Sequence, residues 1–391
     1  MTILFLAIAL AAFPCRANAQ ADADKQAQEL LTQQIEQTDL TGIERAIEQL
    51  DAASGGTLRE TLFPNGFSAA LGDALRGGST LGEGMWEAAK RSFSSIAAQT
   101  ASFLAVLCAS SILCALTSRS IGGVRDEGIV SAAGFACAAF CAVPVLARLT
   151  QNVTAAAQML ERLGLWMEAL MPVMLGVLTA LGATASVHAL RPASVAVNAV
   201  VQKAAIRVIF PMILCMGAFA VIDALGQKRR FEALTAFLSK LIKWSLGTAL
   251  TIFAGVLTLR SINSVSYDAL GIRTMKFTLG NMPVVGGAVS DSMDAVISCL
   301  VLIKNGVGTA GMAAAAALCL IPVAKTAASL LCLRLCGVLS QLLAGEETYR
   351  LTNAACEVFR ALLNVMIAVL LMFFLTVTLT LAAGNAAFTG G

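Results

Sequence analysis

Long runs of apolar residues constrain this chain more than any other feature. Several windows, among them residues 94–117, 128–149 and 361–383, approach or exceed the roughly 18 to 20 residues that a helix needs to cross a bilayer. Hydrophobic residues make up 58% of the 391 positions, and charged residues only 13%. This composition lies well outside that of soluble domains. The sequence therefore predicts an all-α polytopic membrane protein with about six to eight membrane helices.

The first 92 residues differ from the rest in charge. Residues 1–19 are typical of a secretory signal peptide, with an apolar run followed by the small-residue site Ala17-Asn18-Ala19. Residues 20–92 carry 6 basic and 12 acidic side chains, whereas residues 93–391 carry 20 basic and 12 acidic ones. Because a cleaved signal leaves the next residues outside the cytoplasm, we expect 20–92 to be a short helical extracytoplasmic segment. It is either a collar over the membrane body or a passive spacer.

Two capping boxes predict where helices start in this segment. Thr41 with Glu44, and Thr80 with Glu83, have the spacing at which the two side chains satisfy free backbone N–H groups. Farther on, residues 93–170 are expected to form a first pair of membrane helices, followed by an amphipathic helix at 152–169 that lies in the membrane interface.

The second half of the chain contains an internal repeat, with unit 1 at 171–259 and unit 2 at 282–380. Met171-Pro172-Val173 recurs as Met282-Pro283-Val284, and Pro211 follows Pro172 at the same distance of 39 residues at which Pro322 follows Pro283. Interrupted hydrophobic segments at matching positions are typical of transporter-like folds. We therefore expect broken or re-entrant helices in a duplicated unit, and the spacing leaves open whether the units are parallel or inverted. The break in unit 1 is assigned to Pro172, Gly176 and Pro211.

The apolar stretch 281–311 carries many polar and helix-loosening residues. Gly287, Asp291, Asp294 and Ser298 follow at spacings of four, three and four, so they share one stripe of a helix. A carboxylate at membrane depth costs a few kcal/mol, so this stripe must face protein or water. We predict a polar lining with a helix break, formed by Pro283, Gly286, Gly287, Asp291, Asp294, Ser298, Lys304, Asn305 and Gly306. The alternative is that the two acids only cap or shield a helix end, or pair with Lys304 or Lys325.

A basic cluster marks the cytoplasmic side by the positive-inside rule. It consists of Lys228, Arg229, Arg230, Lys240 and Lys243. These side chains either contact anionic lipid or a cytoplasmic partner, or they only set the topology.

Motifs for catalysis and for metal binding are missing from the sequence. Most of the 11 cysteines lie in apolar runs, where cysteine behaves as a small hydrophobe. The pairs Cys137/Cys141 and Cys332/Cys336 have no nearby histidine or carboxylate, so no metal site is expected. With no phosphate-cradling loop or nucleophile motif, we expect no enzyme activity, no cofactor and no nucleic-acid partner.

Two stretches of the sequence resemble the stage III sporulation protein AE family: MPVVGGAVSDSMDAVISCLVLIKNGVG at 282–308 and VVQKAAIRVIFPMILC at 200–215. The resemblance implies a role in endospore formation, as a polytopic component of a multi-protein apparatus made in the mother cell and placed in the membrane around the engulfed forespore. The partners that it implies are the lipid bilayer, the other stage III sporulation proteins of the complex, and the channel protein on the forespore side. The family supplies no established catalytic residues.

From the residues and the resemblance together we expect a membrane platform, or an export-gate-like part, of a conduit between mother cell and forespore that is needed for forespore development. One alternative is a stand-alone secondary transporter that uses Asp291 and Asp294 for ion coupling. Another is a membrane scaffold that conducts nothing.

Neutralising both acids tests the lining role. We expect Asp291→Asn combined with Asp294→Asn to abolish sporulation, because the stripe then loses the charges that attract cations or water. Membrane abundance and complex assembly should stay normal. Spore counts and immunoblots of membrane fractions are the measurements, and unaltered sporulation would remove the acids from the proposed lining.

Overall fold

The structure is a computed structural model that describes residues 41–54, 66–67, 80–121, 127–180, 187, 197–225, 231–280, 286–343 and 346–389. Within these residues the regular elements are all helices, which confirms the all-α fold class. In chain order the elements are α3 (Thr41–Ser54), α6 (Thr80–Ile121), α7 (Glu127–Ala180), the π-helical turn η1 (Ala205–Ile209), α9 (Phe210–Leu225), α10 (Glu232–Gly280), α11 (Gly286–Leu343) and α12 (Glu346–Thr389).

Two helices begin where the capping boxes predicted. α3 begins at Thr41 and α6 begins at Thr80. α6 then continues without interruption to Ile121. The boundary predicted between residues 92 and 93 therefore falls inside one helix, which joins the N-terminal segment directly to the first membrane helix.

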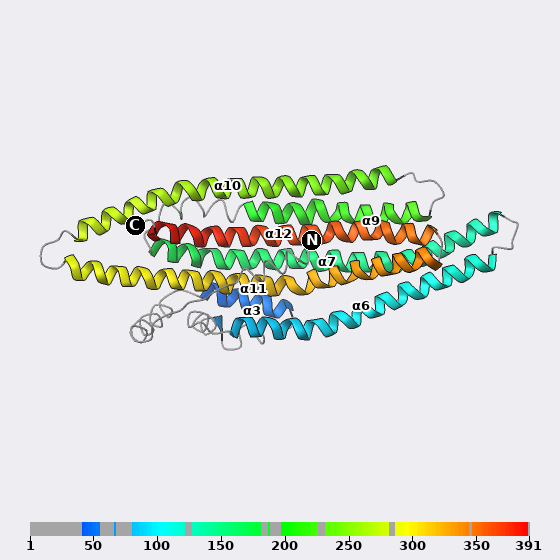
Figure 1. The fold of residues 1–391 in the computed structure, drawn as a ribbon, viewed down its shortest axis with the longest axis horizontal. Helices are drawn as coiled ribbons and strands as arrows, with labels where there is room; N and C mark the ends of the chain where they lie inside the picture. Colours follow the sequence, from blue (N-terminus) through cyan, green and yellow to red (C-terminus); the bar gives the residue numbers. More distant parts are fainter. Residues whose placement is uncertain are drawn as a thin grey trace.

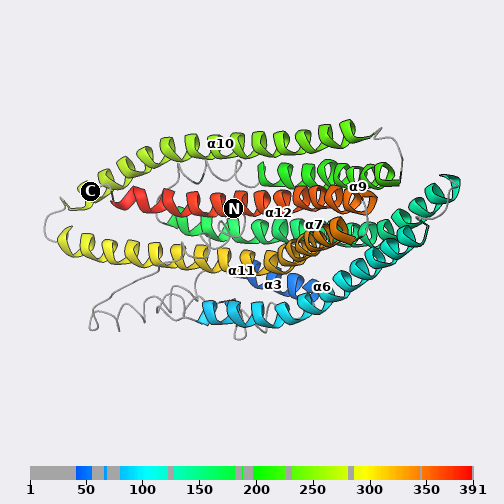
Figure 2. The ribbon, with the colours of Figure 1, turned by 45° about the vertical axis from the view of Figure 1, so that its right-hand side comes forward.

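The long helices pair into three antiparallel hairpins that point the same way (Figure 1). These are α6–α7, α9–α10 and α11–α12. The C-terminal ends of α6, α9 and α11, at Ile121, Leu225 and Leu343, lie toward one end of an elongated bundle, here called the hairpin end. The same arrangement is seen in the second view (Figure 2).

Five described helices contain segments that are long and apolar enough to cross a membrane. The segments are Ile96–Thr117, Phe135–Ala180, Val197–Asp223, Leu300–Gln341 and Thr348–Ala382. α10 is not among them, but α9 ends at the hairpin end and α11 begins at the opposite end (Figure 1). Since α10 carries the chain back beside its neighbours, we infer that it is a sixth crossing. The expected number of six to eight stays a prediction.

The bundle is much longer than a bilayer is thick. α11 has 58 residues and is therefore about 87 Å long, against roughly 30 Å for the hydrocarbon core. The two shortest candidate spans, Ile96–Thr117 and Val197–Asp223, lie toward the hairpin end (Figure 1). We infer that the bilayer surrounds the part of the bundle next to the hairpin end, here called the membrane half, and that the remainder, here called the projecting half, extends beyond it.

α7 and α12 form the centre of the bundle. Their candidate spans are 56% and 50% buried inside the protein, compared with 28% for the span of α6. Large side chains such as Trp166, Phe359 and Phe373 are fully buried there. Because lipid tails are as apolar as these side chains, close packing rather than water exclusion holds such helices together inside the membrane.

The N-terminal segment packs against the projecting half. Ile43, Ala46 and Ile47 on one face of α3 are buried in the same hydrophobic core as α7. The ring of Phe67 meets that of Trp166 edge-on, with 6.4 Å between the ring centroids. The structure thus favours the collar over the passive spacer.

The interfacial helix predicted at 152–169 is wrong, and so is the break at Pro172 and Gly176. α7 is one continuous helix from Glu127 to Ala180, and Pro172 lies inside it. The apolar stripe of this segment, formed by Met159, Leu163, Trp166 and Leu170, is buried in the core. A stripe facing a neighbouring helix has the same period as one facing a membrane surface, so the pattern alone did not separate them.

The directions of the helices do not decide how the two predicted repeat units are related. α9 and α11 both run toward the hairpin end, and α10 and α12 both run away from it (Figure 1). Met171-Pro172-Val173, however, lies at the end of α7, which runs away from the hairpin end, whereas its match at 282–284 directly precedes α11, which runs toward it. The choice between parallel and inverted units therefore stays open. The duplication itself stays a prediction.

The connectivity predicts a specific topology. The three connections at the hairpin end contain Arg125 and Lys228, Arg229 and Arg230, whereas residues 181–196 and 281–285 contain only Arg191. Because basic loops stay in the cytoplasm, reporters inserted near residues 124, 228 and 344 should be cytoplasmic, and those near 188 and 283 should lie outside. Paired fusions to a fluorescent protein and to alkaline phosphatase measure this. Reporters at 188 and 228 that lie on the same side of the membrane would contradict the six-crossing arrangement.

Candidate functional site: polar groups between the helices

The polar stretch predicted at 281–311 forms the beginning of α11. The helix starts at Gly286 and Gly287 and continues through Lys304, Asn305 and Gly306, so the helix break predicted at these residues is wrong. Pro283 lies outside the described residues. Neighbouring helices that pack against α11 supply the contacts that keep it helical despite its glycines.

Asp291 and Asp294 lie in the first turns of α11, at the end of the bundle opposite the hairpin end (Figure 1). Their backbone is helical, and the positions of their side chains lie outside what the structure describes. Ser298, on the same stripe, is exposed. The acids are thus in the projecting half, beyond the point where α9 starts, and not at mid-membrane depth. Their lining role stays a prediction.

Lys304 connects α11 to α12. Its side chain is fully buried, and its Nζ donates a hydrogen bond of 2.7 Å to the backbone oxygen of Leu381. A buried ammonium group needs such acceptors because it has lost its water. The adjacent Asn305 is half-buried, and its Oδ1 is buried without a hydrogen-bond partner. Lys304 therefore joins the two helices of the third hairpin.

Two glycines on the face of Lys304 permit close helix packing. A Cβ atom added to Gly308 would lie 2.6 Å from Leu381 Cδ2, and one added to Gly311 would lie 2.7 Å from Leu170 Cδ2. The oxygen of Gly311 also accepts a hydrogen bond of 2.9 Å from Trp166 Nε1. Small residues at such positions let backbones approach. They bring α11 against both central helices.

The three residues assigned to the break in unit 1 behave differently from one another. Pro172 and Gly176 are exposed on the continuous helix α7. Pro211, in contrast, follows directly after the π-helical turn η1, where Phe210 N–H donates to Ala205 O. Proline has no N–H to bond the carbonyl of Arg207, so the wider turn accommodates the missing bond. The irregularity described near these residues is thus confined to one turn.

The basic cluster is described only in part. Lys240 and Lys243 are exposed on α10, whereas Lys228, Arg229 and Arg230 lie outside the described residues. Next to them, Asp223 Oδ1 accepts a hydrogen bond of 2.9 Å from the N–H of Phe231. The ring of Phe231 also stacks on that of Phe219 at 5.4 Å between the centroids. These contacts hold α9 to the start of α10 at the hairpin end.

A second charged group, Arg148, lies deeper in the membrane half. Its Nε donates to Ser329 Oγ at 3.0 Å, and Asn152 Nδ2 donates to the same oxygen at 3.2 Å. The guanidinium carbon lies 5.5 Å from the centre of the Phe103 ring, a cation–π distance. Arg148 thus ties together α6, α7 and α11.

Two polar atoms near this cluster have no hydrogen-bond partner. Arg148 Nη2 and Thr100 Oγ1 are both buried and unpaired. Cys332 lies nearby, and its Sγ donates to Thr100 O at 3.7 Å. Sequence reasoning missed this cluster, although Arg148 is a charge inside the predicted span 128–149 and such residues merit attention by default. Ser329, the partner on α11, is uncharged and therefore gives no such signal in the sequence.

Several cysteines also meet between helices. Cys114 Sγ lies 3.6 Å from Cys141 Sγ, and Cys336 Sγ lies 3.3 Å from Ser111 Oγ. The cysteines whose side chains the structure describes are free thiols. Within those ranges no group of three or more metal-binding side chains is arranged to hold an ion.

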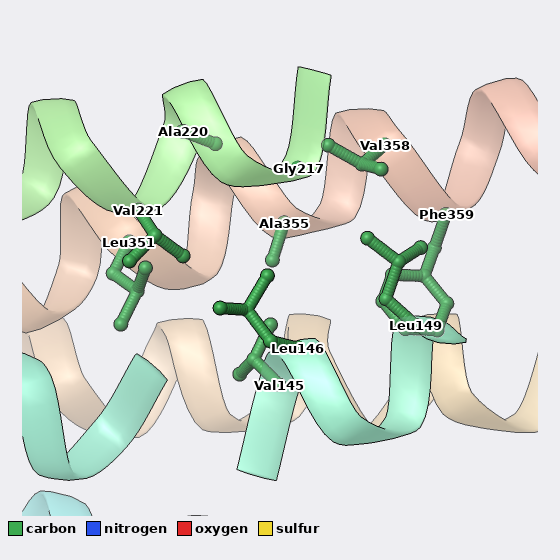
Figure 3. A pocket seen from close by; sticks show the side chains of 10 residues that line it. All are labelled: Val145, Leu146, Leu149, Gly217, Ala220, Val221, Leu351, Ala355, Val358 and Phe359. Atoms are coloured by element: carbon green, nitrogen blue, oxygen red, sulfur yellow. The ribbon is translucent and has the colours of Figure 1, made fainter. Parts of the chain in front are cut away.

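A small cavity lies between α7, α9 and α12 (Figure 3). Its volume is about 10 Å³, and its lining is apolar, formed by side chains such as Leu149, Val221 and Phe359 around Gly217. A water molecule needs polar partners as well as space. The cavity is therefore a packing gap and not a binding site.

Five candidate membrane spans, charged side chains packed between helices, and three hairpins that point the same way define a polytopic α-helical membrane protein. The sequence model of the stage III sporulation protein AE family matches residues 78–384. The chain belongs to this family, and it is accordingly a sporulation-specific membrane protein. The matched range contains all three hairpins.

A curated relative supports the assignment. Stage III sporulation protein AE of Bacillus subtilis (strain 168) is 26% identical to the chain over 218 residues, which is 56% of this chain and 55% of the relative. The match thus spans about half the length of that protein. No solved structure matches the chain.

The Arg148 cluster predicts a difference between two buried serines of α11. Ser329→Ala removes the acceptor of Arg148 and Asn152 and leaves both donors unpaired, which should cost about 1–3 kcal/mol of unfolding free energy. Ser340 is equally buried, but its Oγ bonds only Gly337 O in its own helix. Ser340→Ala is therefore the control and should be nearly neutral. Thermal unfolding of the purified protein in detergent measures both, and equal losses would contradict the bridging role of Ser329.

Proposed function

We propose that the protein is an integral component of a secretion-like channel complex that links mother cell and forespore, and that forespore development needs it. The observation that carries this proposal is the family match over residues 78–384, because it covers the entire membrane body. In this proposal the protein lies in the mother-cell membrane that surrounds the forespore, after insertion that depends on its signal peptide. It has no enzymatic role.

The contacts between the helices fit a component that supports other proteins. Lys304 and Arg148 use their hydrogen bonds to join neighbouring helices, and the packing gap in Figure 3 is too small and too apolar for a solute. A rigid bundle of this kind suits a platform or an export-gate-like part better than a stand-alone transporter, which needs a polar site that opens to each side in turn.

The projecting half supplies a surface for partners. By the positive-inside rule this half lies outside the mother-cell cytoplasm, in the space between the two membranes around the forespore. α3 covers α7 there, and the first turns of α11 carry Asp291 and Asp294. In the proposal this end meets the other stage III sporulation proteins and, through them, the channel protein of the forespore.

Affinity purification from sporulating cells tests the proposal. The tagged full-length chain, extracted in mild detergent, should bring down the other stage III sporulation proteins, because a component of the complex is held by interfaces that survive extraction. A polytopic membrane protein of unrelated function, made from the same promoter, is the control. Mass spectrometry and spore counts of a deletion strain are the measurements.

Three outcomes would count against this function. Recovery of the chain alone, together with solute uptake by the purified protein in vesicles, would favour the lone transporter. Normal forespore development in the deletion strain would remove the developmental role. Co-isolation without any permeability in reconstituted complexes would point to the non-conducting scaffold.

A further inference from the structure

A polar stripe runs along the exposed side of α12 within the membrane half. Asn353, Glu357, Arg360 and Asn364 follow at spacings of four, three and four, and therefore lie on one face of the helix. Asn353 is exposed and Asn364 is half-buried. The side chains of Arg360 and Glu357 are 39% and 42% exposed, and they form an ion pair of 2.5 Å with each other.

The stripe lies at the depth of the hydrocarbon core. Glu357 and Arg360 are 11 and 14 residues from the start of α12 at Glu346, or about 17 and 21 Å from the hairpin end. Both belong to the candidate span Thr348–Ala382, whose mean hydropathy of 2.6 is the highest of the five spans. Polar groups are therefore concentrated on one face of the most apolar span described.

The α6–α7 hairpin has a different surface in its membrane part. Its exposed side chains include Ile112 and Leu113 on α6, and Phe140 and Val143 on α7, the last of them 67% exposed. Such a surface is suited to lipid, and a surface with a carboxylate, a guanidinium and two amides is not. The bundle thus has one flank suited to acyl chains and one that needs protein against it.

The chemistry of the stripe indicates which protein. Its two charges are opposite, so its net charge is zero, and each asparagine both donates and accepts hydrogen bonds. A second copy inserted in the same membrane has the same orientation. Each residue of the stripe therefore faces residues that lie at the same depth in the other copy. Asparagines then pair across the interface, and Glu357 of each copy comes within reach of Arg360 of the other. A two-fold interface of this kind uses one surface twice.

We propose that α12 is a homo-oligomerisation helix, and that the stripe Asn353–Glu357–Arg360–Asn364 is the contact between two copies of the chain inside the bilayer. The interface goes beyond the proposed role in the channel complex and does not depend on it. Interhelical hydrogen bonds between polar side chains supply the specificity, as they do in other membrane helix pairs.

Co-capture of two tagged copies tests the interface. The full chain is expressed with two different tags in the membrane of a host that makes no sporulation proteins, and one tag is used to recover the other. Glu357→Arg, which gives the stripe only positive charge, and Arg360→Glu, which gives it only negative charge, should each lower self-capture by about tenfold or more. Co-expression of one variant with the other should restore capture, because the opposite charges then face each other.

Controls separate this interface from misfolding. Size-exclusion profiles and membrane abundance of each variant report folding, and Leu113→Met with Val143→Leu on the lipid-facing flank should leave capture unchanged. The double variant Glu357→Leu with Arg360→Leu has a more apolar α12 that inserts easily into lipid. This variant should also lose self-capture. Absence of wild-type self-capture, or variants that capture themselves as well as the wild type does, would overturn the proposal. Because the host lacks the other components, neither result bears on the channel-complex role.

Discussion

The structure depends on one constraint: inside a bilayer, a polar group must find its partner within the protein. Helices satisfy their own backbone groups, and the side chains that remain polar satisfy each other between helices. Arg148 reaches Ser329 from α7 to α11, and Asn198 Nδ2 donates to Thr376 Oγ1 at 2.9 Å on α12. These bonds fix which faces of the helices meet, something that apolar packing against apolar lipid determines poorly.

The same constraint explains why proline interrupts so little here. Pro144 and Pro172 lie within α7, and Pro322 lies within α11. Each removes one backbone hydrogen bond, to the carbonyl four residues earlier, and both helices nevertheless stay continuous. Contacts with several neighbouring helices keep each of these helices continuous despite the missing hydrogen bond. At the prolines described here the helices stay continuous, and the irregularity near Pro211 is confined to the single turn η1.

The sequence predicted the class of fold because apolar length and helix period are local properties. The helix starts at Thr41 and Thr80 were predictable for the same reason, since a capping box spans four residues. The path of α7 could not be predicted, because the apolar stripe that contains Met159 and Trp166 has the same helical period whether it faces a membrane surface or a neighbouring helix. Arg148 became significant only when Ser329, 181 residues away, was placed beside it. Long-range partners of this kind leave no pattern in one sequence.

The arrangement of charge along the bundle relates the structure to its role. By the positive-inside rule, the basic loops are expected to place the hairpin end on the cytoplasmic side of the membrane. Within the bilayer, the stripe on α12 carries one positive and one negative charge. Toward the other end, α3 and the acidic start of α11 form a surface that the membrane does not cover. A protein that only filled the membrane would need neither the projection, which takes up about half of the 58 residues of α11, nor the collar that packs on it. The length of the bundle is therefore best explained by a partner outside the membrane, as the proposed function requires, and the polar flank by a neighbour within it.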